Sequence, residues 1–243
     1  MKKLISAMLL IASCAFAQSN ANSSDSDVRY HAHRGFYFSV GTGFAYTSLS
    51  KTINSKSSND PVEETDRFSS LLSYDEFRLG ASIANVASIY AAFGFGFGYG
   101  SYEDEIKRTG DDPKEGSFEE DGNPDIRLLF GVGGEFYPIQ NKESSIYGLF
   151  FGISAGLTLD FVTYTDHYYD DVYDETISTA FANLYCRFEI GKEFWISRRW
   201  SFGVALSYTI GGQEEESGPN YIDEQERESH TGHTFGLMIR LTH

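Results

Sequence analysis

The sequence predicts an all-β chain that folds as an eight-stranded antiparallel up-and-down transmembrane β-barrel. Three observations support this fold class. The 243 residues include 24 Gly and 5 Pro, and 16% of them are aromatic. Apolar residues alternate with small or polar residues in eight segments after residue 34, which is the pattern of strands with two different faces. The connections between these segments alternate between long and short, as expected for successive hairpins of a membrane barrel.

The first four segments each carry an apolar face that is rich in Phe. Gly, Ala, Ser or charged residues occupy the opposite face, so each segment is predicted to form a strand with one apolar and one small or polar side. The apolar positions are Phe36, Phe38, Val40, Phe44 and Tyr46; then Phe77, Leu79, Ala81 and Ile83; then Ile89, Ala91, Phe93, Phe95, Phe97 and Tyr99; then Leu128, Phe130, Val132 and Phe136.

The last four segments repeat the pattern, and Leu129, Phe150 and Val162 break the alternation along the chain. The count of eight strands is even, which is expected to place both ends of the barrel in the periplasm. The apolar positions are Leu149, Phe151, Ile153, Leu157, Leu159 and Phe161; then Ala182, Leu184, Cys186, Phe188 and Ile190; then Phe202, Val204, Leu206, Tyr208 and Ile210; then Phe235, Leu237, Ile239 and Leu241.

The apolar face is predicted to contact lipid, because it spans about nine to eleven residues per strand, the length that a tilted strand needs to cross a membrane. A secreted soluble barrel with the Phe face inside is the alternative. The opposite face would line the interior, and it carries four bases and four acids: Glu76, Arg78, Arg127, Glu135, Asp160, Arg187, Glu189 and Arg240.

These eight charges suggest either of two roles inside a barrel. Eight strands leave an interior that side chains can fill, and a buried charge is costly unless it is paired. The first interpretation is an ion-pair network that fills and stiffens the barrel. The second is a narrow pore whose gate depends on which pairs form.

Charge is concentrated in the long connections, at about residues 48–70, 100–126, 163–178 and 211–232. They hold 26 acidic and 7 basic residues of a chain with formal net charge −16. The sequence therefore predicts four acidic extracellular loops, and it argues against nucleic-acid binding, which needs Lys and Arg. The acidic runs EEDGNPD, DHYYDDVYDE and GGQEEES are candidates for weak binding of divalent cations, although none has the spacing of an EF-hand.

The N-terminus is predicted to be a signal peptide, residues 1–17, with cleavage after Ala17. Lipidation at Cys14 is the alternative, because Ile11 to Cys14 resembles a lipobox. A flexible periplasmic leader would follow over 18–33, and the barrel would occupy 34–243. His31 and His33 in the leader are too few ligands for a structural metal site.

The chain resembles the eight-stranded outer-membrane barrels of the OmpA-barrel and OmpX type over about residues 34–243. Such proteins end in an alternating apolar strand that the barrel assembly machinery reads as a signal. Leu237, Ile239 and Leu241 match this strand, but His243 stands where an aromatic residue is usual. The resemblance implies the outer membrane of a Gram-negative-type bacterium, with lipid and lipopolysaccharide as neighbours. The peptidoglycan-binding domain of full-length OmpA proteins is not expected here.

Two further groups of residues lie at the expected membrane boundaries. Tyr164, Tyr168, Tyr169 and Tyr173 are predicted to form an aromatic belt on the outer side, or to recognise a partner, and Tyr137, Tyr147, Trp195 and Trp200 a belt on the periplasmic side. Strand register predicts that Ser48 and His233 both face lipid near the outer leaflet, with Glu228 nearby. This geometry would suit a lipid A-modifying enzyme.

The sequence therefore predicts a non-enzymatic, monomeric outer-membrane protein with a structural and surface-interaction role through its acidic loops. No cofactor and no metal centre are expected. A small, narrow or gated pore for ions or small solutes is the alternative function, and a lipid A-modifying enzyme is a third. Cys186 is interpreted as a small hydrophobic residue on the lipid-facing side.

Overall fold

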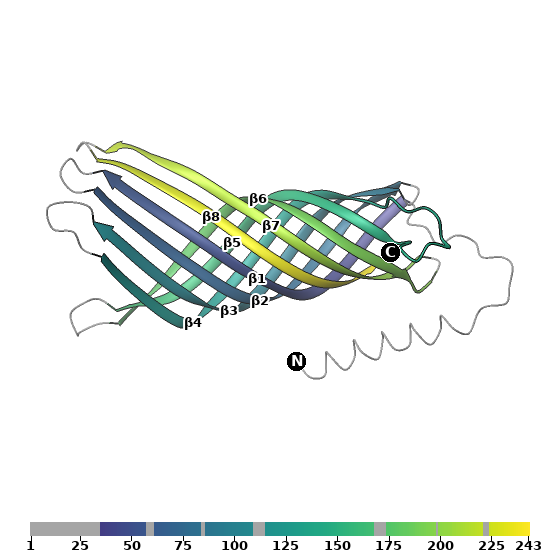
Figure 1. Ribbon diagram of the computed structural model, residues 1–243, viewed down its shortest axis with the longest axis horizontal. Helices are drawn as coiled ribbons and strands as arrows, with labels where there is room; N and C mark the ends of the chain where they lie inside the picture. Colours follow the sequence, from purple (N-terminus) through teal and green to yellow (C-terminus); the bar gives the residue numbers. More distant parts are fainter. Residues whose placement is uncertain are drawn as a thin grey trace.

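The computed structural model describes residues 35–56, 61–83, 86–108, 115–167, 174–197, 199–220 and 224–243, and these residues form a single barrel (Figure 1). The described residues contain no helix long and apolar enough to cross a membrane. The strands are β1 (Gly35–Lys56), β2 (Pro61–Ile83), β3 (Ala87–Arg108), β4 (Glu115–Phe136), β5 (Leu149–His167), β6 (Asp174–Trp195), β7 (Ser201–Asn220) and β8 (Glu224–Thr242).

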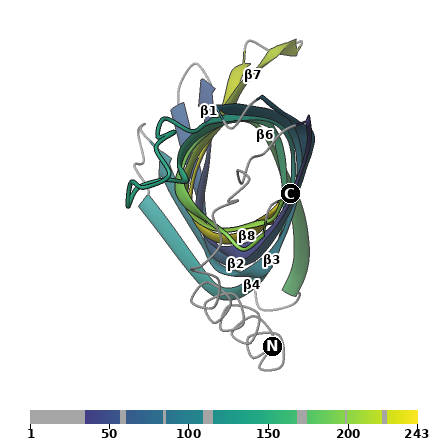
Figure 2. The same cartoon turned by 90° about the vertical axis from the view of Figure 1, so that its right-hand side faces the viewer.

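Every strand pairs antiparallel with the next, and β8 closes the ring by pairing with β1 (Figure 2). The closing register runs from Ser39 opposite Thr242 to Lys56 opposite Gln225. The predicted fold class, an eight-stranded antiparallel up-and-down barrel, is confirmed. We call the end of the barrel that holds Gly35, His243 and the connections 137–148 and 196–200 the turn end, and the opposite end the hairpin end.

The two faces of the sheet have the predicted orientation. The apolar face points outward as a continuous band, with Val132 and Leu184 about two-thirds exposed on it. The opposite face points into the lumen and is buried. Leu129, Phe150 and Val162, which break the alternation in the sequence, all point inward and are buried, so they fill the lumen instead of facing lipid.

The strands are longer than the sequence suggested, and this corrects the prediction of four long loops. β1 continues to Lys56 and β2 already begins at Pro61, so most of the predicted connection 48–70 is a paired hairpin. The other three long connections are likewise mostly strand. Alternation of apolar residues ends with the lipid-facing band, but backbone pairing continues past it, and the sequence pattern did not report that pairing.

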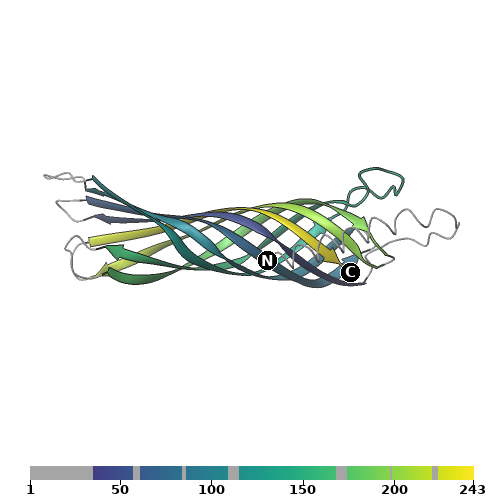
Figure 3. The same ribbon diagram turned by 90° about the horizontal axis from the view of Figure 1, so that it is seen from below.

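The wall of the barrel divides toward the hairpin end. Pairing between β4 and β5 stops at Asp125 opposite Val162, and pairing between β6 and β7 stops at Leu184 opposite Gly212. Beyond these points, within the described residues, β5 and β6 pair only with each other, over Thr163–His167 and Asp174–Asn183. We call this segment the hairpin arm; it is the green hairpin at the lower left of Figure 1, and Figure 3 shows the barrel from below.

Local chemistry explains the gap between β4 and β5. Gly122 is an extra residue in β4, since Asn123 lies opposite Gly100 while Asp121 lies opposite Ser101. Its φ of 88° is a left-handed conformation that favours glycine. Pro124 follows and has no N–H to donate to a neighbouring strand. The bulge and the proline together coincide with the end of the β4–β5 ladder at Asp125.

Candidate functional site

The lumen near the turn end holds a dense group of buried charges, which we call the charge cluster: Glu76, Arg78, Glu135, Arg187, Glu189, Glu193 and Arg240. Arg78 on β2 lies at its centre. Its Nε donates to Glu76 at 2.5 Å, its Nη1 donates to Glu135 at 2.5 Å, and its Nη2 donates to Glu189 at 2.6 Å. One guanidinium therefore connects three strands across the lumen.

Two further arginines complete the charge cluster. Arg187 donates from both of its Nη atoms to Glu76, at 2.5 and 3.1 Å. Arg240 donates to Glu135 through Nη1 and to Glu193 through Nη2, the latter at 2.7 Å. Such two-pronged contacts use the planar donor geometry of arginine, which lysine does not offer.

Neutral donors and aromatic rings surround the charge cluster. Tyr137 donates its hydroxyl hydrogen to Glu135 at 2.8 Å, and Tyr74 donates to Glu76 at 2.9 Å. The guanidinium of Arg240 lies 3.8 Å from the centre of the Phe150 ring. A cation above an aromatic face is stabilised by the ring quadrupole. Phe150 therefore covers the charge cluster on the side of the turn end.

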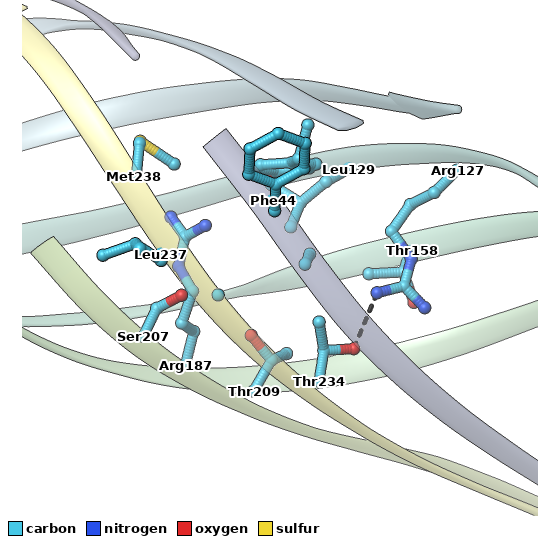
Figure 4. A pocket seen from close by; sticks show the side chains of 13 residues that line it. Phe44, Arg127, Leu129, Thr158, Arg187, Ser207, Thr209, Thr234, Leu237 and Met238 are labelled. Atoms are coloured by element: carbon cyan, nitrogen blue, oxygen red, sulfur yellow. Dashed lines mark hydrogen bonds between the residues drawn. The ribbon is translucent and has the colours of Figure 1, made fainter. Parts of the chain in front are cut away.

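The middle of the lumen is filled by apolar side chains, with a small cavity between them. Leu72, Leu129, Tyr185 and Met238 are part of one buried apolar group. The cavity has a volume of about 20 Å³ and is lined by Arg127 and Arg187 together with Thr and Ser hydroxyls (Figure 4). That volume holds about one water molecule. This part of the lumen is packed rather than open.

A second polar group lies nearer the hairpin end, and we call it the aspartate cluster: Ser70, Asp125, Arg127, Asp160 and Asn183. Arg127 donates from Nε to Asp160 and from Nη1 to Thr234 at 2.6 Å (Figure 4). Ser70 donates to Asp125 at 2.5 Å. Beyond this cluster the lumen is filled again by an apolar group, formed by Leu49, Phe68, Tyr102, Val162 and Phe181.

All eight charged residues that the sequence assigned to the lumen are buried there. Six of them, Glu76, Arg78, Glu135, Arg187, Glu189 and Arg240, come together in the charge cluster, whereas Arg127 and Asp160 form a separate pair. Sequence reasoning missed Glu193 and Asp125, which lay just outside the predicted strands. Glu193 continues the two-residue spacing of Arg187 and Glu189, and Asp125 precedes Arg127 by two residues. Extending the alternation along each strand would therefore have found both.

One predicted aromatic residue is in a different place. Tyr137 was predicted to belong to a periplasmic belt, but it is 7% exposed and its hydroxyl binds Glu135 inside the barrel. Tyr137 follows Glu135 by two residues and therefore shares its side of the strand. Tyr147, Trp195 and Trp200 are partly exposed. The side chains of Tyr164, Tyr168, Tyr169 and Tyr173 lie outside the described part of the structure.

The outer surface brings together two of the three residues considered for lipid chemistry. Ser48 and His233 lie directly opposite each other on β1 and β8, and both are exposed. The hydroxyl of Tyr208 lies 2.8 Å from Nδ1 of His233. No hydrogen bond joins Ser48 to His233 in the described residues, and the side chain of Glu228 is not among them. A lipid A-modifying role for these residues stays a prediction.

The C-terminal strand has its apolar residues on the lipid-facing side. Leu237, Ile239 and Leu241 are exposed there, and the His243 ring packs edge-on against Trp200, with ring centres 4.9 Å apart. Cys186 is partly exposed and free in the described structure. The predicted signal peptide, Cys14, the leader, His31 and His33 lie outside the described residues. Within those residues, no three His, Cys, Asp or Glu side chains group as a metal site.

A closed antiparallel barrel with an outward apolar band and a polar lumen defines a transmembrane β-barrel of the outer-membrane class. No protein-family model matches the chain, and a search of curated protein sequences found no relative. The predicted resemblance to outer-membrane barrels is confirmed at the level of the fold, and the outward apolar band fits the predicted location in an outer membrane.

Several solved structures are similar in fold. The outer membrane protease OmpT from Escherichia coli is 8% identical, with 90% of this chain and 99% of that one covered and a TM-score of 0.44. The outer membrane protein OprG from Pseudomonas aeruginosa is 11% identical, with 87% and 99% covered and a TM-score of 0.44. The outer membrane protein AlkL is 11% identical, with 92% and 96% covered and a TM-score of 0.38.

Proposed function

We propose that this protein is a structural outer-membrane barrel with a filled lumen that binds extended polypeptides at the cell surface. The observation that carries the proposal is the division of the barrel wall at the hairpin end. Four strand edges have no ladder partner among the described residues there: Glu115–Pro124 of β4, Thr163–His167 of β5, Asp174–Asn183 of β6 and Gln213–Asn220 of β7. An unpaired edge offers backbone N–H and C=O groups to an incoming strand.

The charge of these edges defines the chemistry of the partner. The four edge segments contain 10 acidic residues and no Lys or Arg. An acidic edge repels other acidic chains and favours a basic segment, and electrostatic complementarity of this kind raises the rate of association and selects the partner. The expected ligand is therefore a basic polypeptide in extended conformation. The filled lumen supports a surface role over transport, because its central cavity has room for about one water molecule.

The proposal predicts binding that depends on the peptide backbone as well as on charge. The refolded chain in lipid nanodiscs would be titrated with a short fluorescent peptide of alternating Lys and Val, and with the same peptide N-methylated at every second residue. Both peptides carry equal charge, but the second cannot donate the backbone hydrogen bonds. Each such bond contributes about 0.5–1.5 kcal/mol, so loss of several predicts binding weakened at least about tenfold.

Two results would contradict the proposal. Equal binding of both peptides would mean that charge alone attracts them, and binding of neither would mean that the acidic edges serve only to prevent pairing. Single-channel recording of the same preparation in a planar bilayer addresses the alternative function. We expect no discrete current steps; reproducible steps would instead support a narrow pore.

A further inference from the structure

Three buried oxygen atoms at the hairpin end of the lumen have no hydrogen-bond partner in the described structure. They are Oδ1 of Asp125, Oδ2 of Asp160 and Oδ1 of Asn183. Both aspartates are 0% exposed and Asn183 is 2% exposed. A buried acceptor without a donor is costly, because it has lost its hydrogen bonds to water and gained nothing. Three of them in one region indicate that a group is expected between them.

The three side chains lie next to each other on the lumen wall. Asp160 on β5 is directly opposite Arg127 on β4, and Asp125 is the next lumen-facing residue of β4. On the other side, Asn183 on β6 is opposite Thr158, the neighbouring lumen-facing residue of β5. Asp160 is therefore the diagonal neighbour of both others, and it lies between them, because Asp125 is level with Val162 and Asn183 with Thr158. Diagonal neighbours in a sheet are about 7–8 Å apart at Cα, so the Asp160 carboxylate is within reach of an ion shared with either neighbour.

Each aspartate is held by a donor that uses one carboxylate oxygen and leaves the other free. Ser70 on β2 donates to Oδ2 of Asp125 at 2.5 Å, and Arg127 donates from Nε to Oδ1 of Asp160. The group also has excess negative charge, because two carboxylates accompany one arginine. The whole described lumen repeats this imbalance, with four arginines and six acidic side chains buried.

We propose that Asp125, Asp160 and Asn183 form a binding site for a hard divalent cation, with calcium the best fit. Calcium takes oxygen ligands from carboxylates, amide carbonyls and water in irregular geometry, whereas magnesium demands a near-ideal octahedron. The site offers no nitrogen or sulfur ligand that would favour zinc or copper. One divalent ion would also balance the excess charge of the described lumen.

The position of the site in the barrel wall indicates how an ion could enter and what its binding would stabilise. Asp125 is in the last pair of the β4–β5 ladder, and Asn183 lies one residue beyond the last pair of the β6–β7 ladder. The site therefore lies at the foot of the hairpin arm, beside both gaps in the wall. A bound ion would join β4, β5 and β6 where their mutual pairing ends, and would fasten the arm to the rest of the barrel.

Thermal unfolding of the full refolded chain in detergent tests the site. After treatment with EDTA, the midpoint would be measured with and without calcium chloride at constant ionic strength. Calcium at about 100 times its Kd should raise the midpoint of the wild type by about 5 °C or more. Asp125→Asn removes one negative charge from the site and Asn183→Leu removes one ligand oxygen, and each variant should lose most of the rise.

Asp121→Asn is the matched control, because Asp121 belongs to the same acidic run but is exposed. This variant should keep the full calcium response. Loss of the response in Asp121→Asn would assign binding to the exposed acidic surface and overturn the proposal. A wild-type protein whose unfolding midpoint does not respond to calcium would also overturn the proposal. If Asp125→Asn then had a higher midpoint than the wild type without calcium, the excess negative charge would be neutralised by a proton shared between the buried carboxylates.

Discussion

The charge cluster and the aspartate cluster both pair buried carboxylates with arginine, yet they differ in how completely their hydrogen bonds are satisfied. In the charge cluster every carboxylate binds arginine, and tyrosine or serine hydroxyls add further donors to Glu76, Glu135 and Glu193. In the described structure, the one buried polar side-chain atom of the charge cluster without a partner is Nε of Arg240, next to the face of Phe150. The aspartate cluster instead leaves three acceptor oxygens without a donor.

This difference teaches that buried charge serves two purposes in one barrel. A buried network in which every member is paired fixes the positions of the strands that carry it, although it is not in itself a large source of stability. The charge cluster has this form, and it lies where all neighbouring strands are paired. The aspartate cluster lies where the wall divides, and its unpaired acceptor oxygens suit a site that binds a ligand from outside the chain.

The largest expected effect follows from removing one arginine of the charge cluster. Arg240→Ala would leave Glu135 and Glu193 buried with less compensation, and breaking a buried pair on one side costs about 3–5 kcal/mol. Urea unfolding of the refolded barrel in lipid vesicles would measure this loss. Arg67→Ala is the control, because the Arg67 side chain is 55% exposed and its ion pair with Glu105, at 3.6 Å, lies at the surface.

The control should change the free energy of unfolding by no more than about 1 kcal/mol, because surface ion pairs contribute little. Similar effects of Arg240→Ala and Arg67→Ala would mean that the charge cluster is hydrated and loosely held. The charge cluster would then not differ from the aspartate cluster in how firmly its hydrogen bonds hold it.

A smaller effect is expected from two glycines on the same face of β3. A methyl group at Gly94 would lie 2.1 Å from the hydroxyl oxygen of Tyr74, which donates to Glu76, whereas at Gly96 its nearest neighbour would be a Leu72 methyl at 3.3 Å. Gly94→Ala should therefore destabilise the barrel by about 1–3 kcal/mol, the usual cost of overpacking, and Gly96→Ala by much less. Equal unfolding midpoints in urea for the two variants would show that Tyr74 can move freely, against a rigid charge cluster.

Sequence reasoning predicted the barrel well because a period of two is a direct record of which side of a strand faces lipid. The parity of Glu76, Arg78 and Arg187 was sufficient to place them in the lumen, because a one-residue change would move each to the other face. Phe150 shows how a break in the pattern can also be informative. Its inward position over Arg240 explains an apolar residue on a face of glycines and charges.

Other features could not be predicted because no local pattern records them. Which arginine meets which carboxylate depends on the stagger of eight strands around a closed ring, so the connection of Arg78 to Glu189 across 111 residues had no sequence signal. The strands beyond the lipid-facing band lack regular alternation in the sequence, because most of their residues are polar. Asp125 was therefore assigned to a loop, and the second cluster was not recognised as a group.

The smallest expected effect compares two buried serines that make the same kind of bond in the two clusters. Ser201 donates to Glu193 at 3.0 Å, but Glu193 also binds Arg240; Ser70 donates to Asp125, which has no other hydrogen-bond partner in the described structure. Ser70→Ala would leave the buried Asp125 carboxylate without a donor and should lower the free energy of unfolding by about 1–3 kcal/mol. Ser201→Ala should lower it by less than about 1 kcal/mol, because Arg240 still donates to Glu193. Urea unfolding in calcium-free buffer measures both. A larger loss of stability in Ser201→Ala than in Ser70→Ala would contradict this expectation. The charge cluster would then depend on single hydrogen bonds, and the aspartate cluster would tolerate their loss.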